Sequence, residues 1–128
     1  MNDPRFLTVA EVHIFHDQSL AAFGGLNGVR EPGLLESAVA QPQNDFAYAN
    51  ADLHGIAAAY AYHIAQNQPF IDGNKRTAII SALAFLKLNG ESKIVDWKCL
   101  YDAMIAIAEK RMTKAELAQQ FRTLFAGQ

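Results

Sequence analysis

The sequence predicts an all-α protein, a compact bundle of about six helices with one short β-hairpin. Two capping boxes mark helix starts: a Thr at position 8 and another at position 113 are each followed three residues later by a Glu. Apolar residues recur at helical spacing through most of the chain. The 128 residues are expected to form a single domain over 1–128, which is long enough to bury a core without disulfides or metals.

The first two helices follow from capping and helix-breaking residues. A helix should run from its N-cap, Thr8, to about Phe23, where a pair of glycines stops it. Pro32 can open the second helix, because proline is tolerated in the first turn. That helix is expected to reach Ala40 and to be ended by Pro42.

The next segment, Gln43 to Asn50, is the least helical part of the sequence. Its two aromatic residues, Phe46 and Tyr48, are two positions apart, as in a short strand or hairpin. A third helix is expected from about Asn50 to Asn67.

The remaining chain predicts three more helices. The fourth begins at Gly73 or Asn74 and ends at Asn89-Gly90, and it is apolar on nearly every side. A helix of that kind belongs in the centre of a bundle. Asp96 can cap a fifth helix, and Thr113 caps the sixth.

Composition excludes several classes of protein. The net charge of -2 gives no global field that would attract nucleic acid or anionic lipid. The single Cys99 excludes an internal disulfide and fits a reducing cytoplasm. The polar start, Met1 to Arg5, is not a signal peptide, and the longest apolar stretch, Thr77 to Leu86, is too short to span a bilayer. We therefore expect a cytoplasmic protein without direct nucleic-acid or membrane contacts.

The segment QPFIDGNKRT, which opens the fourth helix, carries residues suited to a phosphate. Asp72 supplies a carboxylate that can hold Mg²⁺, and Gly73 lets the backbone turn tightly beside a ligand. The helix N-terminus offers free N–H groups and the positive end of the dipole, and Asn74 adds an amide donor. Lys75 and Arg76 add two cations, of which arginine has a fork suited to phosphate oxygens.

A simpler interpretation uses the same residues for structure alone. Asp72 can be only a cap in a common turn, and Lys75 and Arg76 can be only solvated surface. The spacing by itself leaves both interpretations open. The concentration of two cations, an acid and an amide at the start of so apolar a helix favours a site for a nucleotide polyphosphate with magnesium.

This segment resembles the signature of the Fic/Doc family, and most closely its Doc (death-on-curing) branch. The Fic signature is H-x-F-x-[D/E]-G-N-x-R-x-x-R and Doc-type members typically have HPFxDGNKRTA, where this chain has QPFIDGNKRTA. Further matches lie at Phe23–Gly25, Gly28–Val39 and Pro42–Gln43, so the resemblance covers most of residues 7–90. It implies a compact helical bundle with a β-hairpin flap.

The resemblance also implies roles for individual positions. Asp72 corresponds to the Mg²⁺ ligand, and Gly73 to Arg76 correspond to the anion hole for the phosphates of ATP. The flap, which in this family holds the target segment by strand addition, falls on Asp45, Phe46, Ala47 and Tyr48.

Two positions distinguish the chemistries within the family. Fic enzymes usually transfer AMP to a protein hydroxyl, whereas Doc places ATP the other way round and transfers the γ-phosphate to translation elongation factor Tu, which arrests protein synthesis. Here Lys75 replaces the second motif glycine, and the apolar Ile79 stands where Fic enzymes carry a second Arg. The resemblance therefore favours a toxin kinase that uses ATP and Mg²⁺. No self-inhibitory [S/T]-x-x-x-E-[G/N] motif is present, which implies restraint by a cognate antitoxin.

Gln68 is the largest departure, because it stands where the family has its catalytic His. An amide cannot accept the proton of a target hydroxyl, and losing a general base typically costs about 10²–10⁴-fold in rate. His63 is more than one helical turn earlier and points elsewhere. Gln68 is either an engineered substitution or the natural residue of an inactive or altered homologue. AMP transfer and a non-catalytic role in binding an antitoxin or a target stay open as alternatives.

The other polar residues receive structural roles. His13, His16 and His54 make no metal-ligand spacing and are expected at the surface or in packing. Arg30 is expected to brace the glycine-rich turn before the second helix.

Overall fold

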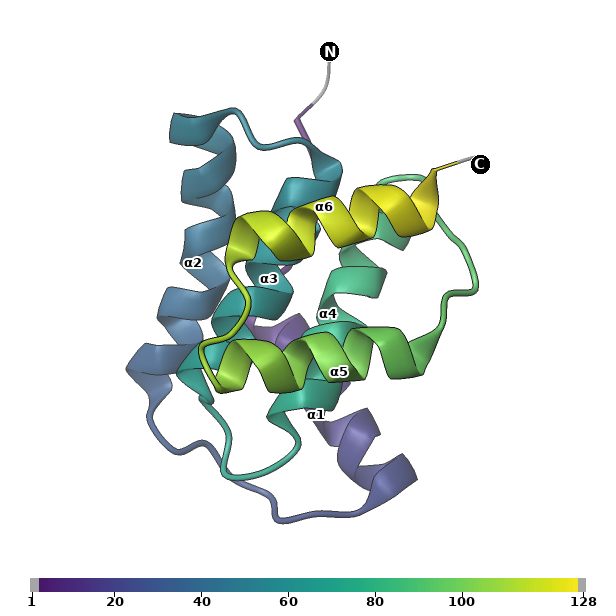
Figure 1. The fold of residues 1–128 in the computed structure, drawn as a ribbon. Helices are drawn as coiled ribbons and strands as arrows, with labels where there is room; N and C mark the ends of the chain where they lie inside the picture. Colours follow the sequence, from purple (N-terminus) through teal and green to yellow (C-terminus); the bar gives the residue numbers. More distant parts are fainter. Residues whose placement is uncertain (1–2, 127–128) are drawn as a thin grey trace.

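The computed structural model describes residues 3–126, and it is helical throughout that range apart from the connections. Within it no β-strand forms; one isolated bridge between two residues is the only β pairing. The elements, drawn in Figure 1, are α1 (Val9–Phe23), α2 (Pro32–Ala49), α3 (Leu53–Asn67), α4 (Asn74–Leu88), α5 (Trp97–Ala108) and α6 (Lys114–Phe125).

Side-chain caps determine where the helices begin. Thr8 and Thr113 each accept a hydrogen bond from the N–H three residues on, and the Glu at that position bonds back to the Thr N–H, which confirms both capping boxes. Asp52 and Asp96 cap α3 and α5 in the same way with their carboxylates. No helix of the described range is long and apolar enough to cross a membrane.

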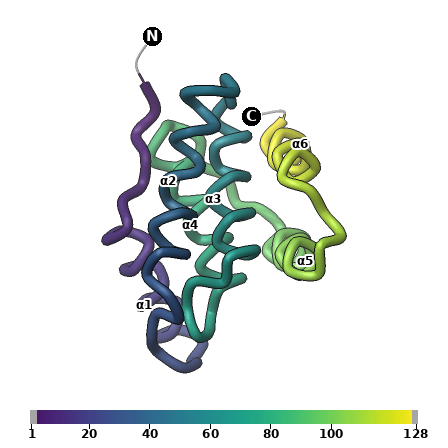
Figure 2. The backbone as a smooth tube through the Cα atoms, turned by 90° about the vertical axis from the view of Figure 1, so that its left-hand side faces the viewer, coloured from purple at the N-terminus to yellow at the C-terminus, as the bar shows by residue number. Residues whose placement is uncertain are grey.

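The helices form three layers around α3. In Figure 1, α3 lies between α2 and α4, with α5 and α6 in front and α1 behind; Figure 2 shows α5 and α6 on one side of this middle layer. α3 packs against α2, α4, α5 and α6. Every residue of Ile56–Ala61 is buried, and the four alanines in this run let the neighbouring helices approach closely.

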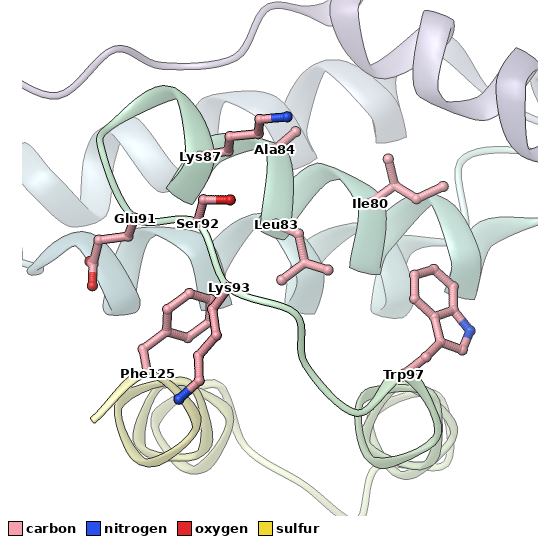
Figure 3. A pocket seen from close by; sticks show the side chains of 9 residues that line it. All are labelled: Ile80, Leu83, Ala84, Lys87, Glu91, Ser92, Lys93, Trp97 and Phe125. Carbon is pink, nitrogen blue, oxygen red and sulfur yellow. The ribbon is translucent and has the colours of Figure 1, made fainter. Parts of the chain in front are cut away.

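The expectation that the fourth helix occupies the centre is therefore only partly met. Ala78, Ile79 and Phe85 of α4 are buried, but its outer face is not fully covered. Ile80 and Leu83 on that face line an open groove of about 290 Å³ beside α5 and α6, shown in Figure 3. The even spread of apolar residues along α4 did not reveal that one side borders a groove.

The hairpin predicted over 43–50 is wrong, because α2 continues through this segment to Ala49. Pro42 lies inside the helix and is buried. It removes one backbone donor, but the apolar stripe formed by Leu35, Val39, Pro42 and Phe46 has helical spacing and packs on the core. The ring of Phe46 meets that of Phe6 edge-on at 5.8 Å between centroids. Packing therefore decides against the local break that a proline suggests.

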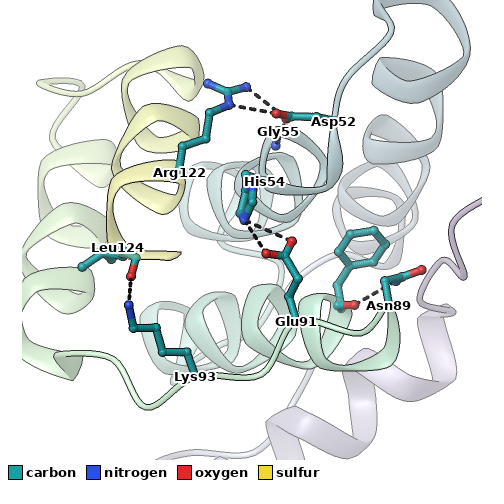
Figure 4. A network of polar contacts seen from close by, with 9 residues as sticks. Asp52, His54, Gly55, Asn89, Glu91, Lys93, Arg122 and Leu124 are labelled. Atoms are coloured by element: carbon teal, nitrogen blue, oxygen red, sulfur yellow. Dashed lines mark hydrogen bonds and ion pairs between the residues drawn. The ribbon is translucent and has the colours of Figure 1, made fainter. Parts of the chain in front are cut away.

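Polar contacts tie the start of α3 and the end of α4 to α6. Arg122 donates to both carboxylate oxygens of Asp52, at 2.9 and 3.0 Å (Figure 4). His54 lies 3.1 Å from the Glu91 carboxylate, and Lys93 donates to the Leu124 carbonyl at 2.7 Å. These contacts lie at the end of α3 opposite to the motif segment, so they leave the motif end of the bundle free.

Candidate functional site

The motif segment and the glycine-rich connection between α1 and α2 lie together at one end of the bundle. Both are at the lower end in Figures 1 and 2. They pair as two short antiparallel segments, with Val29 opposite Phe70. The N–H of Arg30 donates to the Pro69 carbonyl at 2.7 Å, and the N–H of Ile71 donates to Gly28 at 3.0 Å. The one β pairing of residues 3–126 therefore lies here, in the connection before α2, and not in the segment where the hairpin was expected.

The side chain of Asn74 bonds to the backbone of the loop that precedes α4. Its side-chain oxygen accepts from the Phe70 N–H, and its side-chain nitrogen donates to the Phe70 carbonyl, both at 3.0 Å. Phe70 itself is buried in the core. The amide of Asn74 thus braces the loop, so any contribution of this residue to an anion site would come from its backbone N–H.

The side chain of Asp72 is exposed, and its carboxylate faces the connection between α1 and α2. Its Oδ2 accepts from the N–H of Leu26 at 3.2 Å, and its Oδ1 accepts from the N–H of Gly73 at 2.9 Å. Hydrogen bonds from the Leu26 and Gly73 N–H groups hold the pKa of Asp72 below its usual value. The group is therefore an exposed, ionised carboxylate held in one orientation.

Two glycines make this arrangement possible. Gly73 has φ +78° at the N-cap of α4, a conformation that L residues rarely adopt. Gly25 has φ +123°, and a Cβ there would lie 2.9 Å from Asp72 Oδ2. The connection between α1 and α2 can therefore approach the Asp72 carboxylate only through a residue without a side chain.

The start of α4 presents positive charge. Gly73, the N-cap residue of α4, has no side chain that could accept from the first N–H groups of the helix. These N–H groups are therefore uncapped. The guanidinium of Arg76 lies 4.7 Å above the ring of Phe23, which holds this cation at the same end of the molecule. Lys75 forms no ion pair with any residue in 3–126. Uncapped N–H groups and two cations make this helix start suited to an anion.

His16 on α1 packs against the buried side of the motif loop. Its ring is buried and stacks on Phe70, with centroids 3.8 Å apart and planes 7° apart. Its Nε2 lies 2.8 Å from the Asp72 carbonyl, and because a carbonyl only accepts, Nε2 carries the proton. The packing role expected for His16 is met, but its bond to the motif was not foreseen. Its place on the inward stripe with Val12 and Ser19 was the available signal.

Gln68 is the C-cap of α3 and has a left-handed backbone, with φ 49°. Its side chain is exposed and bonds to no residue in the described range. Its backbone is held from outside the motif, because Arg30 Nε donates to the Gln68 carbonyl at 2.9 Å and Arg30 Nη2 donates to the Asn67 carbonyl at 2.7 Å. The side chain of Arg30 therefore braces the turn that ends α3, and not the glycine-rich turn that it was expected to brace.

The residues assigned to a flap do not lie at this site. They are on the last turns of α2, about 20 Å along the helix axis from its start beside the motif. Asp45 instead bonds to Lys114 at 2.7 Å, and Tyr48 projects into solvent with 87% of its surface exposed. The group concerned is Asp45, Phe46, Ala47 and Tyr48.

His63 cannot take the place of the missing histidine. It lies 3.2 Å from Lys114 Nζ, on the side of α3 that faces α6. Burial and then the Lys114 ammonium lower the pKa of His63 to about 4. Since an ammonium group only donates, His63 Nε2 is the acceptor in this contact. This histidine is part of the packing between helices.

The site fits magnesium with a nucleotide but not a metal held by protein alone. No group of three or more His, Cys, Asp or Glu side chains that could hold a metal ion occurs in residues 3–126. Magnesium usually binds through one or two carboxylates together with substrate phosphates. Asp72, which is ionised and exposed beside the cationic start of α4, meets that requirement.

The chain matches known proteins over most of its length. A family model described as the Fic/DOC family matches residues 6–86. The chain is similar to the protein kinase doc of Escherichia phage P1, with 33% identity over 124 residues that cover 96% of this chain and 98% of that protein. It is also similar to the toxin Doc of Mycolicibacterium smegmatis, with 44% identity over 85 residues that cover 59% of this chain and 60% of that protein.

Proposed function

Since this chain belongs to the Fic/Doc family, we propose that its scaffold is that of a Doc-like toxin, a protein kinase that phosphorylates a translation factor. The observation that carries the proposal is the loop from Asp72 to Arg76, where an ionised carboxylate adjoins the uncapped, cationic start of α4. The named relatives support the kinase and toxin assignments. The target class we propose is elongation factor Tu, acted on in the cytoplasm, and a cognate antitoxin would restrain the toxin.

In the proposed reaction, a Thr or Ser hydroxyl of the target attacks the γ-phosphorus of ATP. A new O–P bond forms and the bond from that phosphorus to ADP breaks. In Gln68→His the imidazole would take the hydroxyl proton, whereas in this chain Gln68 cannot and the proton would pass to solvent. The N–H groups and cations at the start of α4 would bind the phosphates, and Asp72 would hold magnesium, which supplies charge neutralisation on the phosphates. The exposed apolar residues Leu26 and Ile71 next to the loop suit contact with a polypeptide target.

The buried position of Ile79 supports phosphate transfer over AMP transfer. Ile79 is 1% exposed and packs in the core. The apolar Ile79 offers no cation to a phosphate, whereas the Fic signature has its second Arg at this position. The predicted hairpin is absent from residues 43–49, so we propose another surface to hold the target segment. This surface is the extended backbone around Val29, which lies beside the motif.

Gln68 favours a second candidate, a homologue that binds nucleotide, antitoxin or target without catalysis. Its amide cannot take a proton at any useful pH. Because its side chain makes no hydrogen bond within 3–126, none of the hydrogen bonds that hold the loop depends on it. The chain as it stands should therefore bind ATP with Mg²⁺ and transfer phosphate about 10²–10⁴-fold more slowly than a variant with a base.

The test is Gln68→His, assayed with elongation factor Tu and ATP labelled on either the α- or the γ-phosphate. We expect γ-label on the factor in Gln68→His, little with Gln68, and none when Asp72→Ala is added. Growth arrest on expression without an antitoxin should follow the same order. Label from the α-phosphate would replace the kinase proposal by AMP transfer. Tight binding of ATP with Mg²⁺ by calorimetry but no transfer by Gln68→His would favour the non-catalytic homologue.

A further inference from the structure

Arg30 binds three consecutive carbonyls around position 68, although it lies outside the motif. Its Nη2 donates to Asn67 at 2.7 Å, its Nε to Gln68 at 2.9 Å, and its backbone N–H to Pro69 at 2.7 Å. One residue of the α1–α2 connection thus holds the whole turn in which α3 ends.

The turn needs such a brace for two physical reasons. Gln68 adopts φ 49°, a left-handed conformation that is unfavourable for an L residue. The last carbonyls of α3 also lack helical partners and carry the negative end of the dipole, so a cation there is favourable. The planar fork of Arg30 spans two adjacent carbonyls, which the single ammonium of a lysine cannot do in the same way.

The two halves of the motif loop are anchored by different residues. Asn74 and His16 fix the part from Phe70 to Asp72. Within residues 3–126, the turn before it is held by Arg30, by the Asn67 side chain donating to Leu34 at 3.1 Å, and by the Gln68 N–H donating to Ile64 at 3.0 Å. The direction in which the side chain at position 68 leaves the backbone therefore depends on Arg30.

We propose that Arg30 is a positioning residue for position 68. It fixes the turn so that a base placed there points into the phosphate site, and it does so through backbone carbonyls without touching the nucleotide. The catalytic half of this proposal rests on the kinase function proposed above, whereas the conformational half does not.

Arg122→Gln provides a matched control for Arg30→Gln. Arg122 also makes two bonds from its Nε and Nη2, to the carboxylate of Asp52. Asp52 caps the N-terminus of α3, at the opposite end of the same helix. The two variants remove comparable side chains, but only one of them should affect the motif.

The first measurement is hydrogen exchange in the chain with Gln68. The Ile71 N–H, which bonds to Gly28, reports on the pairing beside Arg30. We expect Arg30→Gln to lower the protection of this N–H by about tenfold or more, because hydrogen bonds from a charged group are among the stronger ones in a protein. Arg122→Gln should leave it unchanged. Unchanged protection in Arg30→Gln, or an equal loss in both variants, would overturn the proposal.

The second measurement uses the Gln68→His background and phosphate transfer to elongation factor Tu. Arg30→Gln should lower kcat by about tenfold or more while KM for ATP stays the same, since misplacement of a catalytic group reduces the rate steeply. Arg30→Lys should restore part of the loss, and Arg122→Gln should change neither constant. A kcat unaffected by Arg30→Gln overturns the positioning role. If Gln68→His itself transfers no phosphate, the proposed function fails, and the exchange result still decides the conformational half.

Discussion

Acid should destabilise this protein through His63, a half-buried histidine between α3 and α6. Burial and the Lys114 ammonium lower its pKa from 6.5 to about 4 in the folded protein. The unfolded chain therefore binds a proton at His63 between these two values while the folded chain does not. By linkage, the stability from the neutral His63 is fully present above pH 6.5 and is lost as the pH falls towards 4.

The size of the effect follows from the gap between the two pKa values. About 2.5 pH units at about 1.36 kcal/mol each give an upper limit near 3 kcal/mol. Because water still reaches part of the ring, we expect about 2 kcal/mol. The Lys114 ammonium also bonds to Asp45 at 2.7 Å, so it remains beside His63 across this pH range.

The assay is urea unfolding at pH values between 4.5 and 7.5, with His63→Gln for comparison. Gln can still accept from Lys114 Nζ but does not titrate, so it removes the pH term and keeps the contact. The free energies of unfolding of the two proteins should be closest near pH 7 and diverge by about 2 kcal/mol as the pH falls to 4.5, where the parent becomes the less stable. Carboxylates with lowered pKa values, such as Asp52 and Glu11, contribute the same pH dependence of stability to both proteins, so they cancel in the comparison. Parallel curves would refute the assignment of a neutral, cation-facing His63.

Two further predictions concern the site and the core. Gly25→Ala should weaken binding of ATP with Mg²⁺ about tenfold or more by calorimetry, since the new Cβ would lie 2.9 Å from Asp72 Oδ2. Gly24→Ala, which shares the positive φ but meets no atom within 4 Å, should lose stability without that defect, and equal binding in both variants would contradict the steric argument. Tyr60→Phe should cost about 1–3 kcal/mol in urea unfolding, because the Leu7 N–H loses its buried acceptor. Since burial raises the pKa of Tyr60 to about 12, stability should fall between pH 10 and 12 in the parent and less in the variant.

Local chemistry made most helix boundaries predictable. The caps at Thr8, Asp96 and Thr113 need only residues within three positions, and the helices begin where these caps predict. The error at Pro42 arose because a strong local signal was given more weight than the apolar spacing that continues to Phe46. Helix spacing across a proline was the better predictor, since packing on α3 outweighs one lost hydrogen bond.

In the candidate site, too, features that depend on neighbouring residues were predictable, whereas long-range contacts were not. The motif positions are adjacent in sequence and could be assigned from type and spacing. Their anchors are distant: His16 is 56 residues from Asp72, and Arg30 is 38 from Gln68. Single-sequence spacing carries no signal for contacts of that length. Burial of His16 on the inward face of α1 was predictable, but its partner was not.

The way this loop is held explains how binding and catalysis can be separated in this fold. Every contact that anchors position 68 within 3–126 goes to backbone atoms: Arg30 binds the carbonyl, and the N–H donates to Ile64. A change of side chain at 68 therefore alters the chemistry without removing a support of the loop. The Asp72 carboxylate and the start of α4 are fixed by other residues. We therefore expect Gln68→His to test catalysis alone, and the chain with Gln68 to keep the proposed nucleotide site without the proposed base.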